Sequence, residues 1–316
     1  MSDNKLPLVS VIITNYNYAQ YVGEAIESAL NQTYKNIEII VIDDGSTDNS
    51  PEVIRKYTEN NKNIRYVRQK NKGVVFARNA GLEKAQGEFL LFLDGDDIFP
   101  SEYIETLEQY AASKSIDVVY TDYEIFGSDS SLSSFPDYDI EKLKRGNYIH
   151  ISAFLRRSAI AGHKFDEALN KLTHEDWDFF LGIALTDVRI AKNSDTKLRY
   201  RAHSTSRSMW KDADAYRTQT YKLVKSTFYI VGKYKNIYPG NIDIYDDSEI
   251  VEWCMLSLDR LQRIHLLHKE LDEKDATIDE KIKTERELRL ELEDVKNSKS
   301  YRILKKVATI KNKIIR

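Results

Sequence analysis

The sequence contains little cysteine: Cys254 is the only one among 316 residues. One thiol excludes an intrachain disulfide framework and a zinc site built from cysteines, and it is typical of a reducing compartment. No apolar run is long enough for a transmembrane helix, and the N-terminal residues lack the basic and apolar regions of a signal peptide. We therefore expect a protein of the cytoplasmic side, either soluble or peripheral.

Other features that the sequence lacks narrow its function. It has neither a Gly-x-Gly-x-x-Gly fingerprint nor a loop ending in Gly-Lys-Ser/Thr, which argues against dinucleotide-binding and P-loop sites. The formal net charge is only −3, so the overall balance does not indicate a nucleic-acid partner. With 41% hydrophobic residues, the chain is long enough for one α/β domain and an appendage.

Strand-like and helix-like segments alternate through the first two thirds of the chain. Runs of β-branched and large apolar residues predict strands at 8–14, 37–42, 64–68, 89–93, 116–122, 154–157 and 197–201. Apolar spacing and start signals such as Ser50-Pro51-Glu52 predict helices at about 19–30, from 50, 74–86, 103–112 and 173–185. This alternation predicts an α/β fold with a mostly parallel central sheet flanked by helices.

Three of the predicted strands end in polar clusters. Since the carboxyl ends of parallel strands share one edge, the clusters at 14–16, 43–44 and 94–97 would line one crevice. Asp94 and Asp96, two residues apart with Gly95 between them, can converge on Mg²⁺ or Mn²⁺ that also contacts phosphate oxygens. A turn rich in Asp and Gly is the alternative, and turn or cap roles are open for 43–44 as well.

Seven short motifs, in order and with fitting spacing over residues 6–210, resemble the signatures of family 2 inverting glycosyltransferases. They are SVIITNYN at 10–17, ALNQTY at 29–34, VIDDGSTD at 41–48, ARNAG at 77–81, LDGDD at 93–97, HEDWD at 174–178 and YRAH at 200–203. The resemblance implies the GT-A fold of nucleotide-diphospho-sugar transferases. It also implies a nucleotide-diphosphate sugar as donor.

The resemblance assigns the donor site to five residues. Thr14 and Tyr16 would frame the nucleotide base, Tyr16 by stacking, and Asp44 would accept a hydrogen bond from a uracil or thymine imide. Asp43 would be a further participant. Arg78 would lie near the donor diphosphate, and a salt bridge on the helix surface is its alternative role.

The resemblance also implies a metal site and a catalytic base. Asp96 would bind Mn²⁺ or Mg²⁺ with His203 nearby, and Asp94 would contact the ribose or a metal-bound water. Asp176 would be the general base and Glu175 would help to orient the site. Acidic residues in the first turn of any helix interact favourably with the helix dipole, which is the alternative role of Glu175 and Asp176. A lone histidine is often only a packing residue, which is the alternative role of His203.

The implied reaction is a metal-dependent, inverting transfer of sugar from a UDP- or dTDP-sugar to a hydroxyl group. The acceptor would be a glycan or a polyprenyl-linked glycan in the synthesis of a bacterial surface polysaccharide or glycoprotein glycan. The irregular polar stretch at 127–136 would face this acceptor. Two alternatives are a nucleotidyltransferase, whose Gly-rich N-terminal loop the chain lacks, and a catalytically silent scaffold recruited to a membrane.

The chain changes character after the predicted transferase domain, residues 1–212. We expect a helical segment at 213–260, with helices at 216–234 and 248–268, and a long charged helix at 261–297. Its interrupted heptad predicts either a coiled coil that makes a homo-oligomer or a single solvated helix. Residues 298–316 form a basic amphipathic pattern suited to the anionic inner face of the cell membrane, although it could instead pack on protein.

Overall fold

The structure is a computed structural model that describes residues 6–203, 213–237 and 278–297. The chain divides into two compact units, Met1–Met209 and Trp210–Arg316. The strands of the first unit are β1 (Val9–Asn15), β2 (Ile37–Asp43), β3 (Ile64–Arg68), β4 (Phe89–Asp94), β5 (Val118–Gly127), β6 (Ser131–Ser133), β7 (Phe154–Arg156) and β8 (Ile190–Ala202). Its helices are α1 (Val22–Leu30), α2 (Ser50–Asn60), α3 (Val74–Lys84), α4 (Tyr103–Lys114), α5 (Ile140–Leu143), α6 (Arg157–Ile160), η1 (Glu167–Leu169) and α7 (Glu175–Ala184).

All strands described in the first unit belong to one sheet. The strand order is β3-β2-β1-β4-β7-β5-β6, and β8 pairs with β5. The pairs β1–β2, β1–β4, β2–β3 and β5–β8 are parallel, whereas the pairs that β7 makes with β4 and β5, and the β5–β6 pair, are antiparallel. The predicted α/β fold with a mostly parallel central sheet is thus confirmed.

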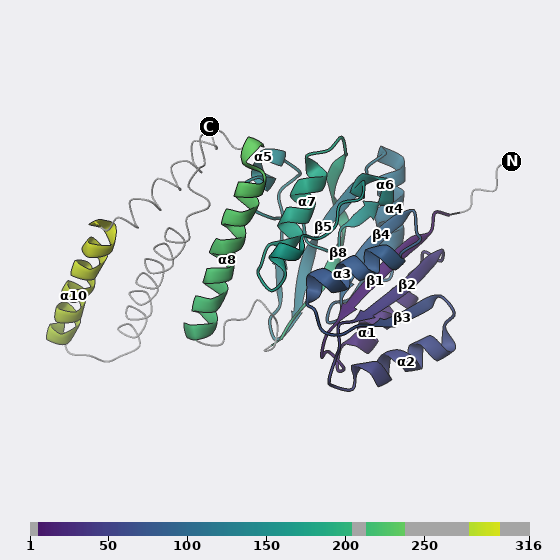
Figure 1. Cartoon of the computed structure of the whole chain (residues 1–316), viewed down its shortest axis with the longest axis horizontal. Coiled ribbons are helices and arrows are strands. Elements are labelled where there is room, and N and C mark those ends of the chain that lie inside the picture. Colours follow the sequence, from purple (N-terminus) through teal and green to yellow (C-terminus); the bar gives the residue numbers. More distant parts are fainter. Residues whose placement is uncertain (1–5, 204–212, 238–277, 298–316) are drawn as a thin grey trace. The chain divides into compact units, whose positions relative to one another are not determined.

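Helices cover both faces of the sheet (Figure 1). On one face, α1, α2 and α4 pack their apolar residues onto alternate residues of β1, β2 and β4. On the other face lie α3 and α7. A side chain at Gly81 of α3 would overlap Ile12 of β1, and Phe165 contacts both Phe92 of β4 and Phe179 of α7. The central strands read as continuous apolar runs because both of their faces are buried.

The predicted irregular stretch at 127–136 is partly regular. β5 continues to Gly127, and β6 turns back to pair with it. The following residues are also fixed: the backbone N–H of Phe135 donates to Asp122, and the Tyr120 hydroxyl donates to the carbonyl of Pro136. A Ser- and Asp-rich sequence carries no strand signal of its own, so the pairing comes from β5.

One predicted helix start is confirmed and one differs. The helix predicted from 50 begins at Ser50 as α2, with Asn49 at the N-cap position. The helix predicted from 173 begins at Glu175, and its N-cap, His174, has a φ of 68° and makes no side-chain cap hydrogen bond. A left-handed residue at this position reverses the chain directly before the acidic first turn of α7.

The second unit contains α8 (Ala213–Lys233), η2 (Lys235–Ile237) and α10 (Ile278–Asn297). The helix predicted at 216–234 is confirmed by α8. The predicted helix at 248–268, the start of the heptad pattern and the basic stretch at 298–316 lie outside the described residues. In α10, the heptad positions Leu288 and Val295 are buried, and the coiled coil stays a prediction.

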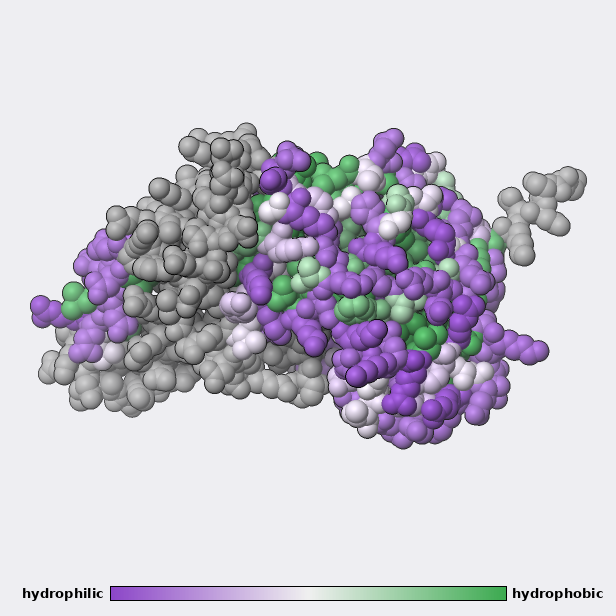
Figure 2. All heavy atoms as spheres, viewed as in Figure 1, coloured by the Kyte–Doolittle hydropathy of each residue, from purple (hydrophilic) through white to green (hydrophobic). Residues whose placement is uncertain are grey.

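None of the described helices combines the length and the apolar character that crossing a bilayer requires. On the face drawn in Figure 2, hydrophobic residues of the first unit reach the surface in small areas between hydrophilic ones.

Candidate functional site

The polar clusters predicted at three strand ends lie together at one edge of the sheet. The register places Thr14 of β1 opposite Asp94 of β4, and Asn15 opposite Asp43 of β2. The Thr14 hydroxyl donates to Asp94 Oδ1 at 3.0 Å, so the clusters of β1 and β4 touch. The carboxyl edge of the sheet therefore brings together residues proposed for the donor and for the metal.

At the end of β2, Asp43 is fully buried and organises its own turn. Its carboxylate accepts hydrogen bonds from the Ser46 backbone N–H and the Tyr66 hydroxyl, both at 2.9 Å. Arg68 Nε lies 3.4 Å from the same carboxylate. Burial and the bond to Asp43 raise the pKa of Tyr66 to about 12, so Tyr66 remains a donor. This carboxylate has no exposed surface with which to reach a ligand directly.

The neighbouring Asp44 holds the loop that leads into α3. Its Oδ1 accepts hydrogen bonds from Gln69 Nε2 at 2.7 Å and from the Lys72 backbone N–H at 2.9 Å, and its Oδ2 accepts one from the Gly73 N–H at 2.7 Å. A carboxylate has about four lone-pair sites. Asp44 thus fixes this loop and retains limited capacity for one further donor.

The loop after β1 is tied to the loop after β2. Asn17, in the left-handed region at φ 57°, accepts hydrogen bonds from the backbone N–H groups of Thr47 and Asp48. Tyr16 beside it is 44% exposed, so its ring is accessible for stacking. Asn17 is a residue that our sequence reasoning missed as a site element, although it ends the first motif.

Arg78 joins the strand edge to α7. Its Nη2 lies 3.3 Å from Asp94 Oδ1, and its Nη1 lies 3.2 Å from Glu175 Oε1. The side chain is 5% exposed, so the alternative of a salt bridge on the helix surface is wrong. Burial alone would lower the pKa of Arg78, but Asp94, Glu175 and Asp176 together raise it. Arg78 Nε has no hydrogen-bond partner among the described residues.

The turn after β4 presents two further carboxylates. Asp96 Oδ2 lies 2.9 Å from His203 Nε2, and Asp97 accepts a hydrogen bond from the Arg201 backbone N–H at 2.8 Å. Burial and then Asp94 raise the pKa of Asp96. Burial, Asp96 and Asp94 raise that of Asp97 well above its usual value. This surplus of negative charge in a buried turn would be relieved by a cation.

The Asp96–His203 pair fits a divalent cation as two of its ligands. Two donor atoms at about 2.1 Å from an octahedral ion, at right angles, lie about 3 Å apart, which is close to the 2.9 Å separation of Oδ2 and Nε2. In the part of the chain that the structure describes, no three His, Cys, Asp or Glu side chains form a metal-binding group. The remaining ligands would have to be water and substrate oxygens.

The two carboxylates predicted to take part in catalysis lie in the first turn of α7. Glu175 is buried against Arg78. Asp176 lies deep in the protein, although part of it still reaches solvent. Burial and then Glu175 raise the pKa of Asp176 to about 6, while Arg78 opposes the shift. A carboxylate with this pKa is ionised at neutral pH and more basic than an ordinary aspartate, which suits a general base.

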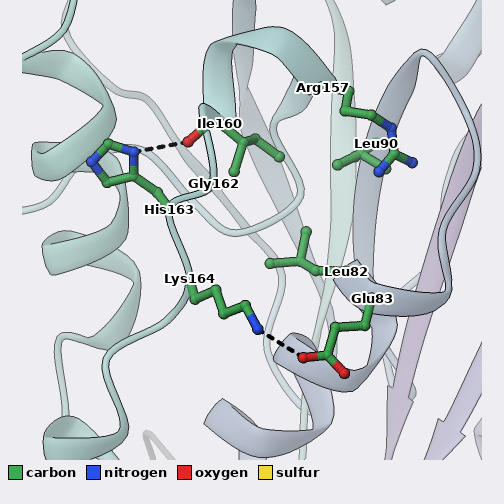
Figure 3. A pocket seen from close by; sticks show the side chains of 8 residues that line it. All are labelled: Leu82, Glu83, Leu90, Arg157, Ile160, Gly162, His163 and Lys164. Carbon is green, nitrogen blue, oxygen red and sulfur yellow. Dashed lines mark hydrogen bonds and ion pairs between the residues drawn. The ribbon is translucent and has the colours of Figure 1, made fainter.

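A hollow of about 180 Å³ lies away from these residues. Figure 3 shows its lining near the start of β4, with Leu90 next to Arg157 and Leu82 near the Lys164–Glu83 ion pair. Leu90 is the second residue of β4, whereas the carboxylates follow the other end of that strand. None of the predicted site residues lines this hollow.

Comparison with known proteins agrees with the motifs. The model described as Glycosyl transferase family 2 matches residues 10–162. An uncharacterized glycosyltransferase of Haemophilus influenzae is 31% identical over 245 residues, which cover 72% of this chain and 94% of that protein. Glycosyltransferase GlyG of Streptococcus pneumoniae is 42% identical over 132 residues, which cover 42% of this chain and 43% of GlyG. The chain thus spans nearly all of one relative and less than half of the other.

Solved structures support the fold. TarS 1–349 of S. aureus in complex with UDP-GlcNAc has a TM-score of 0.59 and 21% identity, over 79% of this chain and 71% of that one. The mannosyltransferase PcManGT from Pyrobaculum calidifontis, in complex with GDP-Man and Mn²⁺, has a TM-score of 0.55 and 17% identity, over 99% and 86% of the two chains. These similarities show a GT-A-like fold.

Proposed function

The chain belongs to glycosyltransferase family 2, and from that premise we propose that it transfers a sugar from a nucleotide-diphosphate donor to a hydroxyl group with inversion. The observation that carries the proposal is the arrangement around Arg78. This one buried guanidinium contacts Asp94, at the strand end beside the proposed cation ligands, and Glu175, beside the proposed base. The parts needed for leaving-group departure and for nucleophile activation are thus fixed to each other.

In this proposal, Asp176 takes the proton of the acceptor hydroxyl as the new glycosidic bond forms. A sugar hydroxyl is a poor nucleophile at neutral pH, and a positioned base contributes about 10² to 10⁴ in rate. Glu175 and Arg78 set the electrostatic environment of this carboxylate, since Glu175 raises its pKa and Arg78 opposes the shift. A single displacement at the anomeric carbon inverts its configuration, and charge develops there as in glycoside hydrolysis.

We assign the cation to Asp96 and His203, whose donor atoms lie close enough to share one ion. Mn²⁺ or Mg²⁺ bound there would supply Lewis-acid stabilisation of the departing diphosphate. PcManGT, whose fold is similar, has been solved with Mn²⁺, which supports this choice of metal. Asp94 remains oriented by Thr14 and Arg78, at a position from which it would contact the ribose or a metal-bound water.

For the donor we favour a UDP- or dTDP-sugar. Tyr16 offers an exposed ring for the base, and Asp44 keeps capacity to accept a hydrogen bond from the imide N–H of uracil or thymine. TarS, similar in fold, has been solved with UDP-GlcNAc. PcManGT binds GDP-Man, so a guanine nucleotide is the competitor that any test must include.

The acceptor is proposed to be a glycan, free or polyprenyl-linked, in the synthesis of a bacterial surface polysaccharide or glycoprotein glycan. The relatives are bacterial glycosyltransferases, which supports the bacterial setting of this proposal. A peripheral location on the inner face of the cell membrane, through the basic pattern at 298–316, would bring the enzyme to lipid-linked acceptors. Removing residues 298–316 should then move the protein from the membrane to the soluble fraction with donor binding retained; unchanged fractionation would reject the membrane role.

Calorimetric titration with UDP, dTDP, GDP and CDP, each with Mn²⁺ and with EDTA, tests the donor site. We expect metal-dependent binding of UDP or dTDP. Tyr16→Ala should weaken it about tenfold, because it removes one stacked ring, while Tyr110→Ala on α4 serves as an aromatic control. Failure of a folded protein to bind any of the four would overturn the proposal and favour the catalytically silent scaffold.

A further inference from the structure

Arg201, near the end of β8, makes an unusual number of contacts with the proposed cation site. Its backbone N–H donates to Asp97 Oδ1 at 2.8 Å, and its side-chain Nε donates to the carbonyl oxygen of Asp96 at 2.7 Å. Its Nη2 donates to Glu24 Oε2, also at 2.7 Å. One residue thus connects the turn after β4 to the first turn of α1.

The Arg201 guanidinium also contacts two aromatic rings. It lies 4.7 Å from the centre of the Tyr21 ring and 4.5 Å from that of Phe126. The Tyr21 ring in turn lies 4.8 Å from the ring of His203. The side chain of Arg201 is 12% exposed, so these contacts are made largely out of solvent, where cation–π attraction is strongest.

The contacts of Arg201 fix the cation ligands without occupying them. The guanidinium bonds the carbonyl of Asp96 and leaves its carboxylate facing His203. Arg78, by contrast, contacts the carboxylate of Asp94 itself. A positive charge behind the turn also offsets the repulsion among the carboxylates at 94, 96 and 97, whichever of them are ionised.

We propose that Arg201 is a positioning residue that holds Asp96 and His203 at the separation at which both bind one divalent cation. It secures Asp96 through the backbone and His203 through the Tyr21 ring. This inference rests on the proposed function, since it concerns the metal of that reaction. Partners that orient metal ligands typically change affinity 10- to 100-fold when they are replaced.

The test is Arg201→Lys in the full chain, with Arg199→Lys as the matched control. Arg199 lies two residues earlier on the same strand, 4.4 Å from the same Phe126 ring, and none of its side-chain contacts reaches residues 94–97. Lysine keeps the charge but cannot make the Nε bond to Asp96 and the bond to Glu24 together. Mn²⁺ affinity is measured in the presence of UDP by calorimetry or by the EPR signal of free Mn²⁺.

We expect Arg201→Lys to weaken Mn²⁺ binding about 10- to 100-fold, and saturating Mn²⁺ to restore most of kcat. Arg199→Lys should stay within about twofold of the wild type. Equal affinity of a folded Arg201→Lys and the wild type would overturn this inference alone. A wild-type protein that binds UDP but no Mn²⁺ would overturn the proposed metal role and this inference with it.

A second variant covers the case in which Arg201→Lys melts below the assay temperature. Glu24→Gln removes only the exposed partner of the guanidinium, and Glu24 is 53% exposed. We expect it to weaken Mn²⁺ binding about threefold, as for the loss of an exposed ion pair. No change in Mn²⁺ affinity for Glu24→Gln would then count against the inference.

Discussion

The turns after β2 and β4, the two strands that flank β1, have nearly the same composition, but their carboxylates make different contacts. After β2, both oxygens of Asp43 accept hydrogen bonds, from Ser46 and Tyr66, and Asp44 accepts three from the adjacent loop and keeps room for one more donor. After β4, burial raises the pKa of both Asp96 and Asp97, and Asp96 faces a histidine ring nitrogen. The first turn is largely compensated by its own hydrogen bonds, whereas the second brings carboxylates close together that repel one another when they are ionised.

The difference shows what separates a structural carboxylate from a chemical one. Composition does not distinguish the two turns, since both consist largely of Asp and Gly. The number of hydrogen-bond donors that reach each carboxylate distinguishes them, because a carboxylate surrounded by backbone N–H groups is already stabilised. A carboxylate buried beside other carboxylates costs free energy that a ligand can recover.

The largest expected effect comes from the turn after β4. Asp96→Asn should lower sugar transfer about 10³-fold, because the amide is a poor cation ligand and the stabilisation of the leaving diphosphate is worth several kcal/mol. Its melting temperature should not fall, since the change removes a buried charge. Transfer by Asp96→Asn at a rate within tenfold of wild type, at low Mn²⁺, would contradict the contrast between the turns.

The next effect concerns Asp176 and pH. Because the pKa of Asp176 is about 6, the transfer rate should rise as the pH rises through about 6 and should level off above it. Asp176→Asn should lower the rate about 10² to 10⁴-fold and remove this inflection. The pH–rate profile under single-turnover conditions measures both, and an inflection retained in the variant would assign it to another group.

Asp176 should also affect stability in the opposite sense from an ion-paired carboxylate. Its folded-state pKa of about 6 lies above the usual 3.8, so the folded state holds the proton more tightly than the unfolded state does. The resulting stability is present below pH 3.8 and is lost as pH rises through about 6. At pH 8, the free energy of unfolding of Asp176→Asn, measured by denaturant titration, should therefore exceed that of the wild type by about 1–3 kcal/mol. This difference should shrink toward zero as the pH falls toward 4.

A smaller effect is expected at the turn after β2. Asp43→Asn replaces one of the two buried oxygens that accept from the Ser46 N–H and the Tyr66 hydroxyl, and it removes the charge that faces Arg68. The free energy of unfolding should fall by about 2 kcal/mol, measured by urea denaturation. A loss of transfer with unchanged stability would make Asp43 a ligand-binding residue and remove the contrast.

The smallest effect sharpens the same contrast. Arg68 is 49% exposed and lies 3.4 Å from Asp43, so solvent screens the pair. Arg68→Gln should cost less than about 1 kcal/mol of unfolding free energy and should leave the pH dependence of transfer unchanged. A cost equal to that of Asp43→Asn would show that the ion pair, and not the neutral donors, holds the turn.

The sheet was predictable because its central strands are buried on both faces and read as apolar runs. The meeting of the 14–16, 43–44 and 94–97 clusters followed from the parallel order alone. The burial of Arg78 did not, because nothing in the 74–86 pattern says which side of the helix will meet α7, which begins at Glu175. The contacts of Arg201 with Asp96 and Asp97 could not be predicted either, because the recognised motif does not say that its strand will lie beside that turn.

The parallel pairing of β8 with β5 has a consequence for the order in which parts of the protein fold during synthesis. Val118 pairs with Ile190, and the strand so placed carries the chain to His203, 107 residues after Asp96. Pairings of this kind form late, because a long loop must close first, and during synthesis the N-terminal part folds ahead of the rest. A nascent chain would thus complete the loops at Asp43 and Asp44 long before the two proposed cation ligands, Asp96 and His203, meet. Catalytic competence would be acquired in one late step, when β8 docks.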